Sequence, residues 1–405
     1  MYLKLAWRNI WRNKRRTLIT MASVCFAVVL AVIMRSTING VFEKMINDIV
    51  CMSSGYIQIH KRGYWNERSV ENTLEENKEL IRRINEEKNI ISWSPRLESF
   101  ALASTGNRTR GAMVTGIYPD HENRITHLKE KLISGEFIHD TDKCILIPDG
   151  LAKYLRIKIK DTLVLIGQGY HGTIAAAKFP VKGIVKIGSP ELNKSMCWLP
   201  MFACRNFLGT GNRLSSISIL LTKENKMNEV QSQLKNRMNK QDYEVMTWKE
   251  MLPDLDQFIE ADSSAHIITI NILYLIIGFG IFGTLLMMMN ERMHEFGILT
   301  AIGMKKRILS YIVFLEITTI AGMGTMVGIV GAIPVVLYLH FFPIKFTGDL
   351  AKAYEKYGME PVIPSSLDLE NFSSQAMIVF IITLLVSIYL FYKINKLKVL
   401  KAITS

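Results

Sequence analysis

The stretch from His266 to Asn290 reads HIITINILYLIIGFGIFGTLLMMMN and contains no Asp, Glu, Lys or Arg. A helix needs about 20 predominantly apolar residues to cross roughly 30 Å of hydrocarbon. This stretch is long enough, so we predict that it crosses a membrane. Its apolar character alone already separates this chain from ordinary soluble proteins of similar length.

Three further stretches have the same character. Thr17 to Met34 and Ala376 to Tyr392 carry no charge, and Ile308 to Leu339 carries only Glu316. The alternative for the shortest of them is a buried core helix, but its basic flank favours a span. We predict four spans, one before and three after a large polar segment.

Lys and Arg cluster beside these spans, which explains the net charge of +13 without a nucleic-acid partner. The clusters are Lys4, Arg8, Arg12, Lys14, Arg15 and Arg16; Arg292, Lys305, Lys306 and Arg307; and Lys393, Lys396, Lys398 and Lys401. With four spans, all three clusters fall on the same side of the membrane. The positive-inside rule places that side, and both chain termini, in the cytoplasm.

The predicted organisation follows from these spans. It is a cytoplasmic amphipathic N-terminal helix (1–16), span one (17–39), an extracytoplasmic α+β domain (40–265), span two (266–290), a cytoplasmic loop (291–307), span three (308–340), an extracytoplasmic loop (341–375), span four (376–392) and a cytoplasmic tail (393–405). The fold class is therefore a membrane protein with four transmembrane α-helices and one large extracytoplasmic domain.

The N-terminal segment is amphipathic. Leu3, Trp7, Ile10 and Trp11 share one helical face, and Lys4, Arg8, Arg12 and Arg15 share another. Indoles at headgroup depth and cations facing anionic lipid are typical of an interfacial helix. We predict membrane-interface roles for Trp7, Arg8, Trp11 and Arg12; the alternative is a simple basic flank of span one.

The large domain mixes strand and helix signals, which indicates an α+β fold. Predicted strands are 55–60, 112–117, 144–147, 162–166, 179–185 and 216–221, and predicted helices are 124–133, 148–155, 200–208 and 226–239. Thr73 and Glu76 have capping-box spacing and predict a helix that begins at Thr73. The acidic stretch from Met246 to Ala265 predicts a helix that continues into span two, the alternative being a solvated linker.

The chain carries no recognisable catalytic or metal-binding motif. There is no GxxxxGK[ST] P-loop and no HExxH. Its eight His are scattered, and its five Cys show no CxxC spacing. Disulfides among Cys51, Cys144, Cys197 and Cys204 stay open, because sequence alone does not pair them. We predict a non-catalytic subunit that binds no cofactor directly.

Span three contains two features that point to helix packing. A carboxylate such as Glu316 is costly in a membrane unless it is paired or near the interface. Gly324 and Gly328 form a GxxxG step, which allows close approach of a neighbouring helix. The alternatives are a headgroup-level Glu316 and glycines that are simply common in membrane helices.

The loop after span two reads NERMHEFGILTAIGMKKR from Asn290 to Arg307 and resembles the cytoplasmic loop of FtsX/MacB-type ABC transporter permeases. Weaker matches lie in Leu5 to Thr17, Gly116 to Pro119, Ile145 to Val164 and the Glu316–glycine pattern. The order of spans is similar to that of MacB and of the lipoprotein-releasing LolC/LolE-like branch. The ATPase domain fused in MacB has no counterpart here, which favours the latter.

The resemblance implies mechanotransmission, in which a separate ATPase pushes the loop and the spans relay the push to a MacB-like periplasmic core domain. It implies ATP and Mg bound by two ATPase subunits, a second permease copy or homologue, a lipoprotein substrate, a periplasmic carrier and membrane lipid in the bacterial inner membrane. The alternatives are a same-architecture permease for peptide or toxin export, and a receptor or scaffold without energy input.

Residues of the loop suit docking into a partner. Glu291 and Glu295 lie one helical turn apart, and Phe296, Leu299 and Ile302 form an apolar ridge. A short amphipathic helix of this kind can lie in a partner's groove, although an interfacial helix without a partner is the alternative. The predicted ATPase-coupling residues are Glu291, Arg292, Glu295, Phe296, Gly297, Leu299, Ile302, Gly303 and Lys305.

Overall fold

The structure is a computed structural model that describes residues 2–12, 14–239, 241–349, 351, 354 and 360–396, with side chains in the first helix from Trp7 onward. The predicted roles of Leu3, Lys4, Lys398 and Lys401, and most of the predicted C-terminal tail, lie outside this description. The chain divides into two compact units. The helical unit comprises Met1–Glu43, Ile259–Lys345 and Val362–Ser405, and the sheet unit comprises Lys44–Phe258 and Phe346–Pro361.

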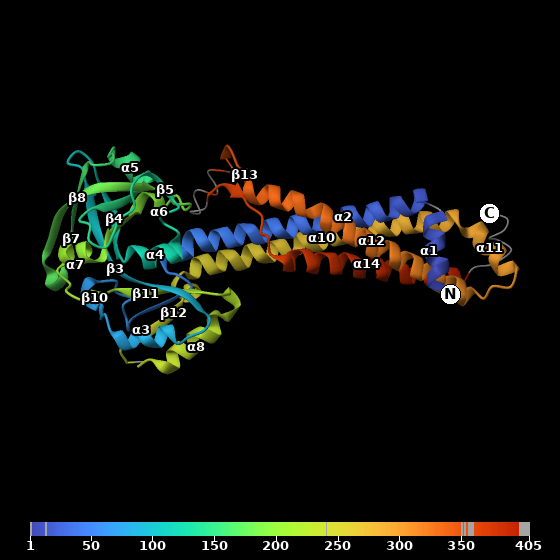
Figure 1. Ribbon diagram of the computed structural model, residues 1–405, viewed down its shortest axis with the longest axis horizontal. Helices are drawn as coiled ribbons and strands as arrows, with labels where there is room; N and C mark the ends of the chain where they lie inside the picture. Colours follow the sequence, from blue (N-terminus) through green and yellow to red (C-terminus); the bar gives the residue numbers. More distant parts are fainter. Residues whose placement is uncertain are drawn as a thin grey trace. The chain divides into compact units, whose positions relative to one another are not determined.

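Long helices dominate the helical unit (Figure 1). They are α1 (Tyr2–Arg12), α2 (Lys14–Met45), α10 (Pro253–Glu291), α11 (Met293–Ala301), α12 (Lys306–Phe341) and α14 (Leu369–Asn395), with β13 (Ile344–Lys345) paired to β14 (Val362–Ile363). Among the described residues, α2, α10, α12 and α14 are long and apolar enough to cross a membrane. This confirms the four predicted spans in the predicted order, one and then three.

The four long helices lie side by side and share one apolar core (Figure 1). Val28 of α2, Ile281 of α10, Ile317 of α12 and Val379 of α14 are all buried in it. Many other apolar side chains of the same helices face outward, including those of Phe26, Phe279 and Leu385. Helices with apolar residues on all sides are expected where the surrounding medium is lipid.

The acidic segment before span two is helical. Thr247 and Glu250 form a reciprocal capping box that opens the short helix α9 (Trp248–Met251). Pro253 then begins α10, with Asp254 and Asp256 in the first turn, where carboxylates are favoured by the helix dipole. The predicted continuous helix is therefore confirmed from Pro253 onward, whereas Met246 and Thr247 end a strand.

In the sheet unit, the described residues form a sheet of ten strands in the order β12-β1-β11-β3-β4-β9-β6-β8-β5, with β7 joining β3 and β8. The strands are β1 (Ile57–Lys61), β3 (Ile90–Ser104), β4 (Thr109–Ile117), β5 (Leu132–Gly135), β6 (Ile145–Pro148), β7 (Thr162–Gln168), β8 (Ile174–Val185), β9 (Met196–Pro200), β11 (Ser216–Leu221) and β12 (Tyr243–Thr247), with β2 (Leu74–Glu75) and β10 (Arg213–Leu214) paired separately. Pairs β4–β9 and β6–β8 are parallel, while the others are antiparallel.

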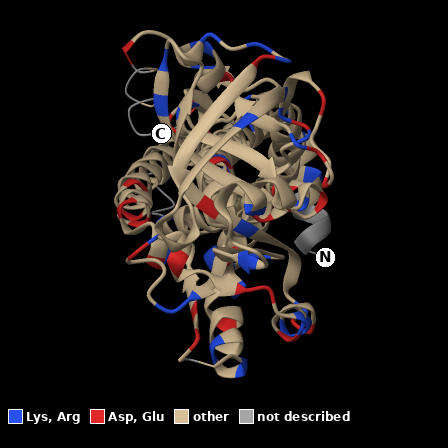
Figure 2. Ribbon diagram, turned by 90° about the vertical axis from the view of Figure 1, so that its left-hand side faces the viewer, with Lys and Arg blue, Asp and Glu red and all other residues tan. Residues whose placement is uncertain are grey.

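Helices pack around this sheet. They are α3 (Lys78–Asn85), α4 (Pro119–Thr126), α5 (Asp149–Leu155), α6 (Leu192–Ser195), α7 (Met201–Leu208), α8 (Met227–Arg237) and α9. Figure 2 shows Lys and Arg interspersed with Asp and Glu over this unit, consistent with surface pairs such as Lys153–Asp149. All five Cys are free thiols, so none of the disulfides left open by the sequence is formed.

Two local predictions are wrong. Thr73 does not cap a helix, because Leu74 and Glu75 pair with β10 and keep the chain extended; α3 begins later, with the Asn77 side chain accepting a hydrogen bond from the Glu79 N–H. The predicted helix over 124–133 ends at Thr126, because His127 adopts a left-handed backbone (φ 50°) and Leu132 begins strand β5.

Candidate coupling site

The segment between α10 and α12 forms a short helix between two turns. Arg292 separates α10 from α11 with a non-helical backbone (φ −104°, ψ 1°). After α11, Gly303 has φ +106°, a backbone conformation that residues with a side chain rarely adopt. Lys305 is extended and precedes α12. The local sequence thus builds a helix–turn–helix in place of the loop.

A buried ion pair connects this turn to α12. The Arg292 Nη1 lies 2.7 Å from Oε1 and 2.6 Å from Oε2 of Glu316, and both side chains are almost fully buried. Breaking such a pair leaves an uncompensated buried charge, which is strongly destabilising. The sequence left open whether Glu316 lies at headgroup level or in a buried contact, and the structure shows a buried contact. The sequence analysis did not predict that Arg292 is its partner.

Weaker ion pairs surround the buried one. Glu295 Oε2 lies 3.4 Å from Arg292 Nε and 3.6 Å from Arg12 Nη2, and Glu291 Oε2 lies 3.6 Å from Arg16 Nε. These pairs are partly exposed, where an ion pair contributes roughly 0–1 kcal/mol. They bring α11 beside the N-terminal segment, an arrangement that spacing along the sequence does not reveal.

The predicted apolar ridge of α11 is divided between core and surface. Phe296 is 1% exposed and belongs to the core of the helical unit, with Gly297 buried beside it. Leu299 and Ile302 are 36% and 80% exposed. Ile298, which sequence reasoning missed, is exposed next to them. Ile298, Leu299 and Ile302 together form what we call the apolar edge of α11.

The glycines of span three lie against α2. A Cβ placed on Gly328 would lie 2.7 Å from Val28 Cβ and 2.9 Å from the Cys25 carbonyl oxygen. One placed on Gly324 would lie 2.9 Å from the Met21 carbonyl oxygen. Real Cβ contacts are longer, so α12 and α2 approach closely because these positions lack side chains.

The N-terminal helix α1 exposes the four residues predicted to lie at a membrane interface, but it buries Ile10, which was predicted on the face of the two tryptophans. Trp7 and Trp11 are 50% and 54% exposed, with ring centroids 6.1 Å apart. Arg8 and Arg12 are exposed as well, while Ile10 is buried. The Thr17 hydroxyl donates a hydrogen bond to the Ile10 carbonyl (2.9 Å) and ties α1 to the start of α2.

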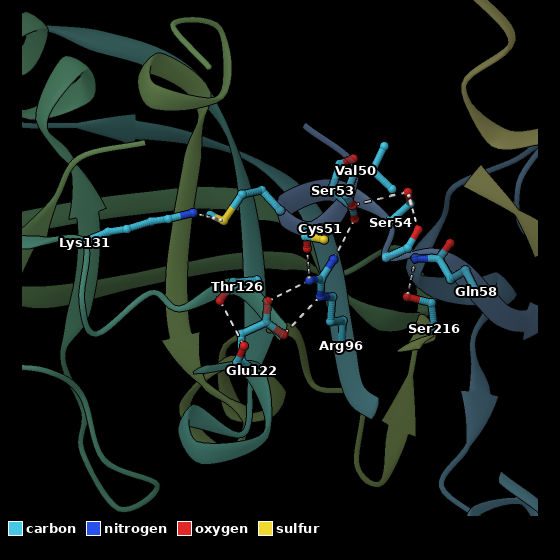
Figure 3. A network of polar contacts seen from close by, with 12 residues as sticks. Val50, Cys51, Ser53, Ser54, Gln58, Arg96, Glu122, Thr126, Lys131 and Ser216 are labelled. Carbon is cyan, nitrogen blue, oxygen red and sulfur yellow. Dashed lines mark hydrogen bonds and ion pairs between the residues drawn. The ribbon is translucent and has the colours of Figure 1, made fainter. Parts of the chain in front are cut away.

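The sheet unit has a buried ion pair of its own (Figure 3). Arg96 of β3 donates from Nε (3.1 Å) and Nη2 (2.7 Å) to the two carboxylate oxygens of Glu122 in α4. It also donates to the carbonyls of Cys51 (3.1 Å) and Ser53 (2.6 Å), at the end of the π-helical segment Ile46–Cys51. Burial disfavours the charged guanidinium, but the Glu122 carboxylate outweighs it and raises the pKa of Arg96.

That network anchors the helix end in the sheet unit. Carbonyls at a helix C-terminus lack partners within the helix, and a cation there also complements the helix dipole. Met52, next in the chain, is buried in a core with Ile117 and Trp198. Within the described residues, no group of three or more His, Cys, Asp or Glu is arranged to hold a metal ion.

Two family models match long segments of this chain. Residues 17–237 match the MacB-like periplasmic core domain, and residues 267–399 match the FtsX-like permease C-terminal family. The first match covers more than half of the chain. Both are families that the loop motif and the order of spans predicted.

The individual relatives have low sequence identity to this chain, but their alignments cover most of it. The lipoprotein-releasing system transmembrane protein LolC of Neisseria meningitidis is 20% identical over 78% of this chain and 75% of its own length. LolC of Xylella fastidiosa strain Temecula1 is 22% identical over 80% of this chain and 78% of its own length. The macrolide export ATP-binding/permease protein MacB of Haemophilus ducreyi is 21% identical over 80% of this chain but 47% of its own length.

Among solved structures, the periplasmic region of MacB from Actinobacillus actinomycetemcomitans aligns with a TM-score of 0.35 at 17% sequence identity. That alignment covers 49% of this chain and 92% of the other. Four apolar helices and these family matches together describe a multi-pass membrane protein with a sheet-rich core domain inserted after its first span.

Proposed function

This chain belongs to the FtsX-like permeases of ABC transporters that carry a MacB-like periplasmic core domain, and we propose that it couples ATP hydrolysis by a separate ATPase to the release of lipoproteins from the membrane. The LolC names of its relatives support the lipoprotein substrate. The basic clusters beside the spans support an orientation with α11 and both termini in the cytoplasm and the sheet unit in the periplasm.

The observation that carries the proposal is the geometry of α11. Its apolar edge of Ile298, Leu299 and Ile302 is exposed, while Phe296 and Arg292 anchor the same helix to the core and to Glu316. An exposed apolar edge on a firmly anchored helix suits a groove in a partner protein. A push on this edge would reach α12 through the Arg292–Glu316 pair without first bending the segment.

A separate subunit would supply the nucleotide chemistry. The MacB relative is named an ATP-binding/permease protein, and this chain spans about half of that protein. The sequence of this chain contains no P-loop. We therefore assign ATP and Mg to an ATPase partner in two copies, and the work to two permease chains that deliver a lipoprotein to a carrier.

The test uses Ile302→Asp in the full-length chain. Ile302 is exposed, so the substitution tests docking without opening the core, which Phe296→Asp would do. We expect the ATPase to stop co-purifying with the tagged chain, and ATP-dependent lipoprotein release from spheroplasts to be lost. Membrane insertion and thermal stability should stay unchanged.

The matched control is Ile91→Asp, which places the same charge on an exposed isoleucine of the sheet unit. It should keep the co-purified ATPase. Normal ATPase binding and release in the Ile302→Asp variant would refute the coupling role of α11. An ATPase that co-purifies with the wild type while no lipoprotein is released would instead favour an export function like the one in the MacB name.

A further inference from the structure

A cavity of about 430 Å³ lies in the helical unit between α1, α11 and the start of α12. Its lining combines Arg8, Asn9 and Arg12 of α1 with the Glu295 carboxylate and with apolar side chains that include Leu299, Leu309 and Ile312. It is within the usual size range of small-molecule sites, roughly 300–1,000 Å³. The α1 part of the lining therefore carries cations and an amide, and the α12 part is an apolar wall.

The cations of the cavity differ in how firmly they are held. Arg292 also lines it but is bound to both oxygens of Glu316. Arg12 is 3.6 Å from Glu295, and its side chain is largely exposed. A guanidinium in a long, exposed pair can exchange its partner at little cost, because such pairs contribute roughly 0–1 kcal/mol. Arg12 is thus free to turn to an incoming anion.

The side chains beside the cavity are of the kinds that favour headgroup depth of a bilayer. Trp7 and Trp11 are half-exposed on the same helix as Arg8 and Arg12. Tryptophan is enriched at the boundary between headgroups and hydrocarbon. Juxtamembrane basic residues attract anionic lipid, and the one carboxylate in the cavity lining, that of Glu295, is outnumbered there by Arg8, Arg12 and Arg292.

From this arrangement we propose that the cavity binds the phosphate headgroup of an anionic membrane lipid. Arg8 and Arg12 contact the phosphate, and the guanidinium fork suits its oxygens. The glycerol and first methylenes lie along Leu309 and Ile312. Free phosphate shares the charge but has nothing to place against the apolar wall. Ile298 and Leu299 of the apolar edge also line the cavity, but lipid binding does not require an ATPase partner, so it is tested on the permease chain alone.

The test exploits the positions of the tryptophans. Of the six Trp in the chain, only Trp7 and Trp11 belong to the helical unit; Trp65, Trp93, Trp198 and Trp248 belong to the sheet unit. Full-length protein is placed in phosphatidylcholine vesicles with an equal small fraction of brominated phosphatidylglycerol or brominated phosphatidylcholine. A Trp7→Phe/Trp11→Phe variant gives the signal of the other four indoles, which is subtracted.

Bromine quenches nearby indoles, so enrichment of one lipid appears as stronger quenching. We expect a preference of about tenfold for brominated phosphatidylglycerol, the ratio that one charge-assisted contact supplies. Arg8→Gln/Arg12→Gln should abolish it, and Arg8→Lys/Arg12→Lys should keep part of it. Unchanged thermal unfolding shows that each variant is folded.

The matched control is Arg15→Gln/Arg307→Gln, which removes the same charge from exposed residues outside the cavity lining. It should keep the preference. Equal loss in this control would reduce the effect to the general basic flank and overturn the proposal. Loss of the preference on adding inorganic phosphate at constant ionic strength would also overturn it, because the site would then bind free phosphate.

Discussion

The buried arginine–glutamate pairs of the two units have the same chemistry but different surroundings. Arg96 and Glu122 lie within the sheet unit, and Arg96 also donates to two backbone carbonyls, so several elements depend on it. Arg292 and Glu316 contact each other through two short hydrogen bonds, and the Arg292 guanidinium also contacts the half-exposed Glu295 and the ring of Phe296, but the described contacts of its side chain include no backbone carbonyl.

This difference suggests different roles. Removing a buried pair that also donates to backbone carbonyls lowers stability even when both charged residues are replaced, because each carbonyl loses its hydrogen-bond donor. A pair that is largely self-contained can be replaced by apolar residues with little loss of stability. The sheet-unit pair therefore suits a permanent anchor, and the helical-unit pair suits a contact whose value lies in transmitting movement. Of the three predictions that follow, the first and third test this difference and the second tests the packing of α12 against α2; they run from the largest to the smallest expected change in unfolding free energy.

Arg96→Met should have the largest effect. It leaves the Glu122 carboxylate buried without its cation and the Cys51 and Ser53 carbonyls without its donors. We expect a loss of about 3–5 kcal/mol in unfolding free energy. Chemical unfolding of the detergent-solubilised full-length chain, followed by tryptophan emission from the buried Trp198, measures it.

The control for Arg96 is Arg82→Met, which removes an exposed arginine 3.7 Å from Glu86. It should change stability by less than about 1 kcal/mol. Arg96→Met/Glu122→Leu should still lose about 1–3 kcal/mol, because the two carbonyls stay unsatisfied. A double variant as stable as the wild type would contradict the role of an anchor for the helix end.

Gly328→Ala should have the second-largest effect on stability, and it tests how closely α12 packs against α2. The new methyl group would meet Val28 and the Cys25 carbonyl of α2, and backbone cannot move aside as a side-chain end can. Overpacking of this kind costs about 1–3 kcal/mol, measured by SDS titration with far-UV circular dichroism. Gly322→Ala on the same helix, with nothing within 4 Å of the new Cβ, should cost nothing. Equal losses in the two variants would deny the close helix contact.

Arg292→Met/Glu316→Leu should have the smallest effect on stability and a large one on function. Replacing both partners removes the charges together, so unfolding free energy should stay within about 1 kcal/mol of the wild type. Without the pair, α11 loses its polar connection to α12, and ATP-dependent lipoprotein release should fall to background. A stable double variant with full lipoprotein release would show that the two charges only neutralise each other in the core and transmit no movement.

Much of the architecture is readable from sequence because it depends on local composition. The strand β11 over Ser216–Leu221 coincides with its prediction, since alternating polar and apolar residues are continuous there. In contrast, β3 was not predicted, because Pro95 and the charged Arg96 interrupt its apolar pattern. Both residues are buried in the sheet, and Arg96 is tolerated there because Glu122 neutralises it and two backbone carbonyls accept its remaining hydrogen bonds.

The candidate coupling site was also predicted only in part from the sequence. Its location after span two, the close-packing glycines and the amphipathic character of α1 were visible in the sequence. Which residues of α11 are exposed was not, because a ridge at helical spacing does not say whether it faces core or solvent. Phe296 is buried and Ile302 is exposed although both belong to the predicted ridge.

The sequence by itself determined the four spans, the order of one and then three, and the large inserted domain, because hydropathy and charge act over stretches of consecutive residues. Only the tertiary structure decided that Arg292 meets Glu316 and that Arg96 meets Glu122 and the end of the π-helical segment Ile46–Cys51. Those partners lie far apart along the chain. The cost of burying a charge can be met only where folding brings its counter-charge within hydrogen-bond distance.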